Sequence, residues 1–202
     1  MTSDSNQQDR HKKRMQRQKA VVDSAVEKAS KDQGVLLVHT GNGKGKSSSA
    51  FGMAARALGH GLHVGVVQFI KGKMSTGEEL FFQKTPGISF HAMGDGFTWD
   101  TQDNEQDKRT TETAWKKAVE FLTDEETHLV ILDELNIALK LNLLPIATVI
   151  DQLNARPQHQ HVVITGRAAK TEIIEIADTV TEMKDIKHAF RAGIQAQKGV
   201  EL

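Results

Sequence analysis

A glycine-rich run that contains a lysine and two hydroxyl side chains offers the clearest chemistry in the chain. Glycines let several backbone amides point into one concavity, and a helix after such a run adds the positive end of its dipole. Lys46 could then neutralise phosphate oxygens, and the Ser47 hydroxyl could ligate Mg²⁺. The run therefore predicts a site for the phosphates of ATP, formed by Thr40, Gly41, Asn42, Gly43, Lys44, Gly45, Lys46, Ser47 and Ser48.

This run departs from the usual phosphate-loop pattern G-x-x-x-x-G-K-[ST] at its first position. Thr40 stands where that pattern has its first glycine, and Lys44 adds a charge inside the loop. A simple glycine-rich turn between a strand and a helix is the alternative. We disfavour it because the apolar strand, the lysine, the hydroxyl and the helix all fall in register. The departure still leaves room for an unusual placement of the nucleotide.

Two adjacent carboxylates come directly after an apolar run at residues 129–132. Asp133 and Glu134 are placed as expected for the strand that delivers acidic ligands to Mg²⁺ beside a phosphate loop. The same pair could merely cap the next helix. Because the phosphate loop is present, we expect at least one carboxylate to serve the metal.

Short apolar runs alternate with helical patterns along the rest of the chain. Expected strands are 35–39, 64–69, 88–92, 129–132, 162–165 and 179–183, and expected helices are 46–58, 105–122, 145–154 and 170–177. Continuous apolar strands between helices favour a mostly parallel sheet covered on both faces. We therefore predict an α/β fold of the P-loop NTPase (RecA-like) type, with long loops at 71–85 and 94–106.

The first 33 residues differ in character from the remainder of the chain. Arg10–Lys19 contains six Lys or Arg and no acid, and Met15, Val22, Val26 and Ala29 can form one apolar stripe on a helix. We predict two parts, a basic amphipathic helical arm at 1–33 and a P-loop α/β domain at 34–202. The basic run is either a solvated helix face or a docking site for an acidic partner.

Composition excludes several classes of function. The 26 basic residues balance the 26 acidic residues, which gives no global electrostatic case for a nucleic acid or a membrane as partner. The absence of cysteine excludes disulfides, thiolate metal sites and a cysteine nucleophile. No stretch approaches the roughly 18 to 20 apolar residues of a membrane span, and the beginning has no secretory apolar core. We expect a cytoplasmic enzyme.

These residues leave open how the ATP is used. A RecA-like ATPase that drives a partner or nucleic acid could use Glu134 as base and Arg167 as the charge at the transition state. A nucleotide-sensing binding protein is a further hypothesis, whereas a kinase is disfavoured because residues 71–85 offer no arginine for a lid. Phe97 and Trp99 lie in a glycine-flanked stretch. They could be a small core under a loop or a platform for a ligand.

A set of motifs in fixed order resembles the ATP:corrinoid adenosyltransferase family, in its housekeeping cob(I)yrinic acid a,c-diamide type. The motifs are HTGNGKGKSSSAFG, RALGHG, VGVVQFIKG, GFTWDT, VILDEL and KHAFRAGIQAQKGVEL. The resemblance covers nearly all of residues 34–202, and GFTWDT together with this phosphate loop is a specific pairing. It implies transfer of the 5′-deoxyadenosyl group of ATP to the cobalt(I) of a reduced corrinoid, with release of triphosphate.

The resemblance also implies roles for individual residues. Lys44 and Lys46 would bind phosphate oxygens of an ATP held in reversed orientation, Ser47 and Glu134 would ligate Mg²⁺ or Mn²⁺, and Asp133 would support the metal. Phe97 and Trp99 would press on the lower face of the corrin and displace the axial base. An adenosine contact for His188 is one alternative, and a structural role is the other.

Partners are implied by the resemblance as well. The resemblance implies that a reduced flavodoxin or free reduced flavin supplies the electron that makes cobalt(I), which agrees with a chain that has no cysteine and no flavin motif. The N-terminal arm would lie over the corrinoid site as a lid, from the neighbouring subunit of a homodimer. Cobalamin or its cobyrinic acid a,c-diamide precursor would be the substrate, in adenosylcobalamin synthesis and corrinoid salvage.

Overall fold

A computed structural model describes residues 3–70, 75–92 and 104–200 of the 202-residue chain. The chain divides into two units, Met1–Gln33 and Gly34–Leu202. The first unit contains one helix, α1 (Ser3–Lys28), whose apolar residues Met15, Val22 and Val26 are exposed. No helix in these described ranges is long and apolar enough to cross a membrane.

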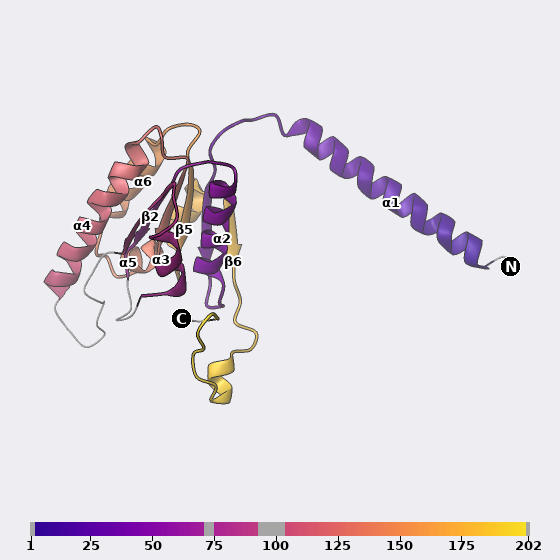
Figure 1. Ribbon diagram of the computed structural model, residues 1–202. Helices are drawn as coiled ribbons and strands as arrows, with labels where there is room; N and C mark the ends of the chain where they lie inside the picture. Colours follow the sequence, from indigo (N-terminus) through magenta and orange to yellow (C-terminus); the bar gives the residue numbers. More distant parts are fainter. Residues whose placement is uncertain (1–2, 71–74, 93–103, 201–202) are drawn as a thin grey trace. The chain divides into compact units, whose positions relative to one another are not determined.

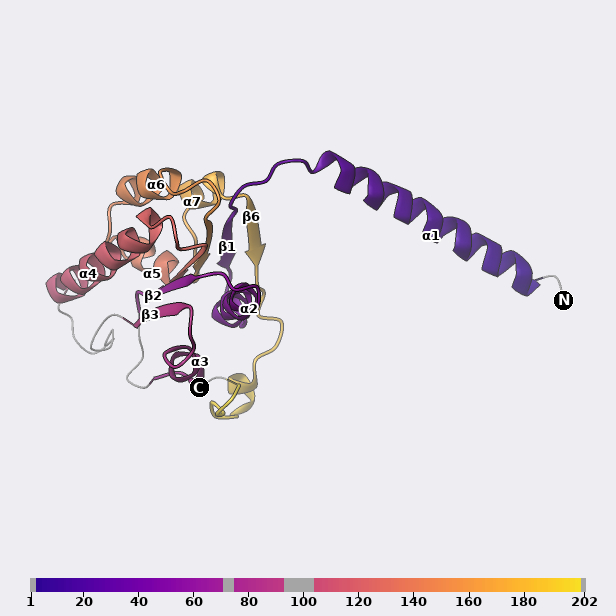
Figure 2. The same ribbon diagram turned by 45° about the horizontal axis from the view of Figure 1, so that its top comes forward.

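The second unit is built on a six-stranded sheet in which every pairing is parallel (Figure 1). The strand order is β3-β2-β4-β5-β1-β6. Figure 2 shows β6 at the edge beside β1 and β3 near β2. The strands are β1 (Leu36–Thr40), β2 (Val64–Gln68), β3 (Ile88–Ala92), β4 (Leu129–Asp133), β5 (His161–Thr165) and β6 (Thr179–Glu182). This confirms the predicted α/β class with a parallel sheet.

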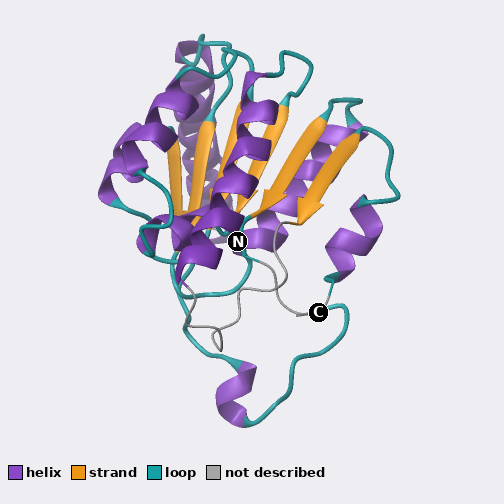
Figure 3. Ribbon diagram, turned by 90° about the vertical axis from the view of Figure 1, so that its left-hand side faces the viewer, coloured by secondary structure: helices purple, strands orange, loops and turns teal. Residues whose placement is uncertain are grey.

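Helices cover both faces of the sheet, as Figure 3 shows. Their bounds are α2 (Lys46–Gly59), α3 (Gly77–Phe82), α4 (Asn104–Thr123), α5 (Leu135–Lys140), α6 (Ile146–Asn154) and α7 (Thr171–Ile176), with a 3₁₀ turn, η1 (Ala189–Ala192), after the last strand. Successive strand side chains point to opposite faces. Val66 accordingly packs under α2 and α3, while Val67 packs under α4 and α5.

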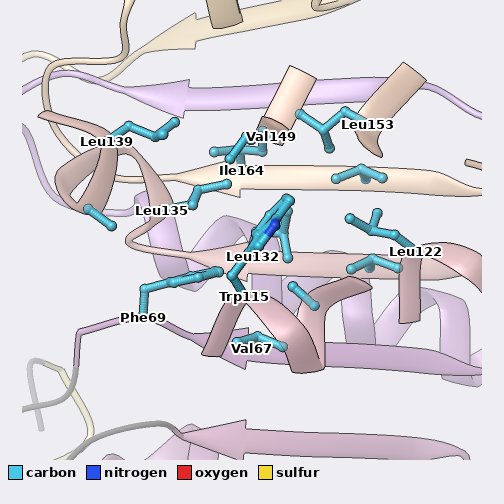
Figure 4. Close-up of a cluster of buried hydrophobic side chains, with 14 of the residues drawn as sticks. Val67, Phe69, Trp115, Leu122, Leu132, Leu135, Leu139, Val149, Leu153 and Ile164 are labelled. Atoms are coloured by element: carbon cyan, nitrogen blue, oxygen red, sulfur yellow. The ribbon is translucent and has the colours of Figure 1, made fainter. Parts of the chain in front are cut away.

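The larger of the two apolar layers lies between the sheet and helices α4 to α7 (Figure 4). Trp115 of α4 packs against Phe69, with ring centroids 6.4 Å apart. Leu132 of β4 and Leu135 of α5 are fully buried in this layer. Because Asp133 and Glu134 lie directly between these two leucines, core packing fixes the backbone that carries both carboxylates.

Two short helices correct the sequence-based expectations. The expected loop at 71–85 contains α3, and no helix was expected at α5. The Thr76 side chain accepts a hydrogen bond from the Glu79 amide at 3.2 Å, and buried Phe82 anchors the other end of α3. Thr76 and Glu79 have the spacing of a capping box, a signal that could have predicted α3.

The expected loop at 94–106 was wrong in its last residues, because α4 begins at Asn104.

Candidate active site

The phosphate loop joins the end of β1 to the start of α2, and its glycines have distinct tasks. Gly41 and Gly45 have φ values of 95° and 105°, in the left-handed region that favours glycine. A Cβ on Gly43 would lie 2.6 Å from the carbonyl oxygen of Lys184. The Gly43 amide also donates to the Met183 carbonyl at 2.6 Å. The chain after β6 therefore backs the loop and holds its shape.

Lys46 is the first residue of α2, and its side chain is buried. Its Nζ donates to the Gly43 carbonyl at 2.6 Å, so the ammonium lies against the loop. Burial lowers the pKa of Lys46, Arg167 and Lys44 lower it further, and Glu134 opposes the shift. A buried cation with one short contact to a glycine-rich loop can exchange that contact for an anionic oxygen.

Asp133 and Glu134 are held at the end of β4 by hydrogen bonds from neighbouring strands. One Asp133 oxygen accepts from Gln68 Nε2 at 2.9 Å, and the other accepts from Thr165 Oγ1 at 2.7 Å. The same Thr165 oxygen accepts from the Glu134 amide at 3.0 Å. Glu134 takes φ 61°, a conformation that costs a non-glycine residue energy and is retained only where its surroundings enforce it.

The charge of Glu134 is costly in this position. Burial and, to a lesser extent, Asp133 raise the pKa of its carboxyl from 4.5 to about 6, although Lys46 and Arg167 act against the shift. A bound cation would favour the ionised form. The electrostatics of Asp133 and Glu134 therefore favour the binding of a cation beside them.

These groups line one cavity of about 760 Å³ at the carboxyl edge of the sheet. In parallel α/β sheets this edge is where ligands bind. The lining residues are Asn42, Gly43, Lys44, Gly45, Lys46, Ser47, Ser48, Phe51, Gly52, Gln68, Thr76, Gly77, Glu78, Phe81, Phe82, Asp133, Glu134, Arg167, His188, Gly199 and Val200.

A family model described as ATP:corrinoid adenosyltransferase BtuR/CobO/CobP matches residues 32–202. The chain belongs to this family. A second model, described as cob(I)alamin adenosyltransferase N terminal, matches residues 1–26 of the adenosyltransferase. Both matches agree with the resemblance carried by the motifs.

Curated relatives of the adenosyltransferase support the same assignment. A corrinoid adenosyltransferase of Pseudomonas aeruginosa is 62% identical over 193 residues, which cover 95% of each chain. The corrinoid adenosyltransferase CobA of Salmonella typhimurium is 46% identical over 193 residues, which cover 96% of this chain and 98% of the relative. The enzyme transfers the adenosyl group of ATP to a corrinoid, which confirms the leading hypothesis over the RecA-like ATPase.

Most of the predicted site residues of the adenosyltransferase line this cavity, with two kinds of exception. Thr40 and Gly41 are not among the described residues that line it. Phe97 and Trp99 lie outside the described residues. His188 does line the cavity, but its Nδ1 also accepts from the Phe190 amide at 3.1 Å and so caps η1. That cap is a structural role, and an adenosine contact stays a prediction.

Several functional positions were missed from the sequence. Gln68 and Thr165, which orient Asp133, end the strands β2 and β5. A polar side chain at the carboxyl end of an apolar strand is the signal that could have found both. The aromatic wall of the cavity was also missed. Phe81, 62% exposed, lies edge-on to Phe82 with ring centroids 5.2 Å apart.

Proposed function

We propose that the triphosphate of ATP binds in the loop Gly41–Ser48 and leaves as a unit. The cobalt(I) electron pair attacks the 5′ carbon, the bond from that carbon to the triphosphate oxygen breaks, and cobalt becomes formally cobalt(III). Lys46 and the loop amides would then stabilise the charge that develops on triphosphate. The buried Lys46 ammonium and its 2.6 Å contact to the Gly43 carbonyl carry this proposal.

We further propose that Ser47 and Glu134 hold Mg²⁺, with Mn²⁺ as the alternative, and that Asp133 supports the metal from behind. The donors fit, because Mg²⁺ takes oxygen ligands and uses only one or two carboxylates beside phosphate and water. Within the described residues no group of three or more His, Asp or Glu side chains is placed to hold a metal. When bound, the metal neutralises phosphate charge. Both Asp133 oxygens already accept hydrogen bonds, which suits a supporting role.

Phe97 and Trp99 belong to the segment that connects β3 with α4. Strand β3 ends at the same sheet edge as Gln68 and Asp133, because β2, β3 and β4 are parallel and in register there. We propose that the two rings cover the lower face of the corrin and displace its axial base. Removing an axial donor makes cobalt(II) easier to reduce, and an apolar wall excludes water from cobalt(I).

The remaining partners are proposals of the same kind. A reduced flavodoxin or free reduced flavin would deliver the electron, and cobalamin or cobyrinic acid a,c-diamide would accept the adenosyl group. The exposed apolar residues Met15, Val22 and Val26 of α1 support an arm that covers another surface. We propose that this surface is the corrinoid site of the neighbouring subunit in a homodimer.

Anaerobic incubation with Mg-ATP and chemically reduced cob(I)alamin tests the phosphate assignment. We expect a light-sensitive alkylcobalamin together with triphosphate, and no product from Lys46→Ala. Lys140→Ala, at an exposed position on α5, is the matched control and should retain activity. Orthophosphate as the product, or a fully active Lys46→Ala enzyme, would overturn the proposal.

A further inference from the structure

The loop between β5 and α7 carries Arg167 to the cavity, between two anchors. At its start, Asn136 Nδ2 donates to the Gly166 carbonyl at 3.1 Å. Gly166 has φ 122° and Ala168 has φ 55°. A left-handed conformation at an alanine costs on the order of 1 kcal/mol or more. The loop therefore keeps this course only if the surrounding structure holds it.

Thr40 provides the second anchor. The Ala169 amide donates to Thr40 Oγ1 at 3.1 Å, across 129 positions of sequence. The Thr40 carbonyl accepts from the Met183 amide at 2.8 Å. Thr40 is thus bonded through its side chain to the loop after β5 and through its backbone to the chain after β6. A glycine at this position, as in the usual phosphate loop, would leave the Ala169 amide without this acceptor.

Arg167 is the residue that this anchoring places. It is exposed and lines the cavity together with Lys46 and Glu134. Its charge acts on both neighbours: beside the larger effect of burial, Arg167 adds to the lowering of the Lys46 pKa and acts against the rise of the Glu134 pKa. A guanidinium presents paired donors that match phosphate oxygens, and it keeps its charge at every physiological pH.

We propose that Thr40 is a positioning residue: its hydroxyl fixes the loop Gly166–Lys170 so that Arg167 binds the triphosphate of ATP. The inference rests on the proposed phosphate site and adds a further cation, from another loop, to its lysines. It also explains why position 40 can hold a threonine where the usual phosphate loop has its first glycine. The positive-φ turn of the phosphate loop falls to Gly41, and the side chain at position 40 is free to connect two loops.

A double-mutant cycle tests the proposal. Thr40→Val keeps the shape of the side chain and removes the acceptor, and Thr40→Ser restores it. The readout is kcat/KM for ATP with pre-reduced cob(I)alamin. Thr40→Val should lower kcat/KM about fivefold, the effect of a typical net hydrogen bond, and Thr40→Ser should stay within about twofold of the parent. In an Arg167→Ala background Thr40→Val should have no further effect.

An equal loss from Thr40→Val with and without Arg167 would overturn the inference, because a purely structural role would act in both backgrounds. Activity in Thr40→Val equal to the parent would overturn it as well. If Thr40→Val does not fold, Thr40→Ala completes the same cycle with a smaller side chain. Lys46→Ala separates the two proposals. If Lys46→Ala is fully active, the proposed phosphate site itself is wrong. If Lys46→Ala is inactive but the effects of Thr40→Val and Arg167→Ala are additive, only the proposed role of Thr40 is wrong.

Discussion

Replacing Glu134 by glutamine should stabilise the enzyme above pH 6 when nucleotide and metal are removed. Burial, with the neighbouring Asp133, raises the pKa of this carboxyl from 4.5 to about 6. At a pH where Glu134 is ionised, the buried charge therefore lowers the free energy of unfolding, because the carboxyl ionises more easily in the unfolded chain. Glutamine keeps the shape of the side chain and removes the charge. The same change should raise the Mg²⁺ concentration needed for turnover.

The magnitude comes from the two pKa values. The folded state binds more protons than the unfolded state between pH 4.5 and about 6, so stability falls as pH rises through that window. The difference, 6 minus 4.5, at 1.36 kcal/mol per unit, corresponds to about 2 kcal/mol. Glu134→Gln should thus exceed the parent by up to about 2 kcal/mol near neutral pH and match it at a pH well below 4.5.

Urea unfolding in the presence of a chelator and without nucleotide measures this difference at both pH values. Glu175→Gln is the matched control, because Glu175 is exposed on α7, and it should behave like the parent at every pH. Equal stability of Glu134→Gln and the parent near neutral pH would refute the reasoning. So would an advantage that does not shrink on acidification.

Two further predictions concern the corrin-facing rings and the phosphate loop. Phe97→Ala combined with Trp99→Ala should reduce turnover that starts from cobalt(II) at least about tenfold more than turnover of pre-reduced cobalt(I), a difference equivalent to about 1.4 kcal/mol in barrier; equal losses in the two assays would exclude an effect through cobalt coordination. Gly43→Ala should weaken ATP binding, measured by calorimetry, because its Cβ would lie 2.6 Å from the Lys184 carbonyl oxygen and displace the loop. Gly59→Ala is the control: its Cβ meets nothing within 4 Å and Gly59 does not line the cavity, so this variant should bind ATP like the parent. Undiminished ATP binding by Gly43→Ala would count against a close-packed loop.

Much of the fold was predictable because its signals are local. Buried parallel strands appear as continuous apolar runs, and each expected strand matches the observed one to within a residue at each end. Strand β1, for example, starts and ends one residue later than expected. Helix α3 was missed although Thr76 and Glu79 carry its capping signal, since six residues with exposed Phe81 show little helical periodicity.

In the candidate site, too, the features that are local in sequence were predictable and the long-range contacts were not. The phosphate loop and the Asp133-Glu134 pair are contiguous in sequence, so residue type and spacing were enough to predict them, and the ordered motifs identified the family. The partners of these residues come from other strands. Gln68 reaches Asp133 across 65 positions, and Ala169 reaches Thr40 across 129. A parallel sheet brings the carboxyl ends of distant strands to one edge. Only the tertiary structure could therefore decide that Thr40 holds a second loop and that Arg167 joins Lys46 at the cavity.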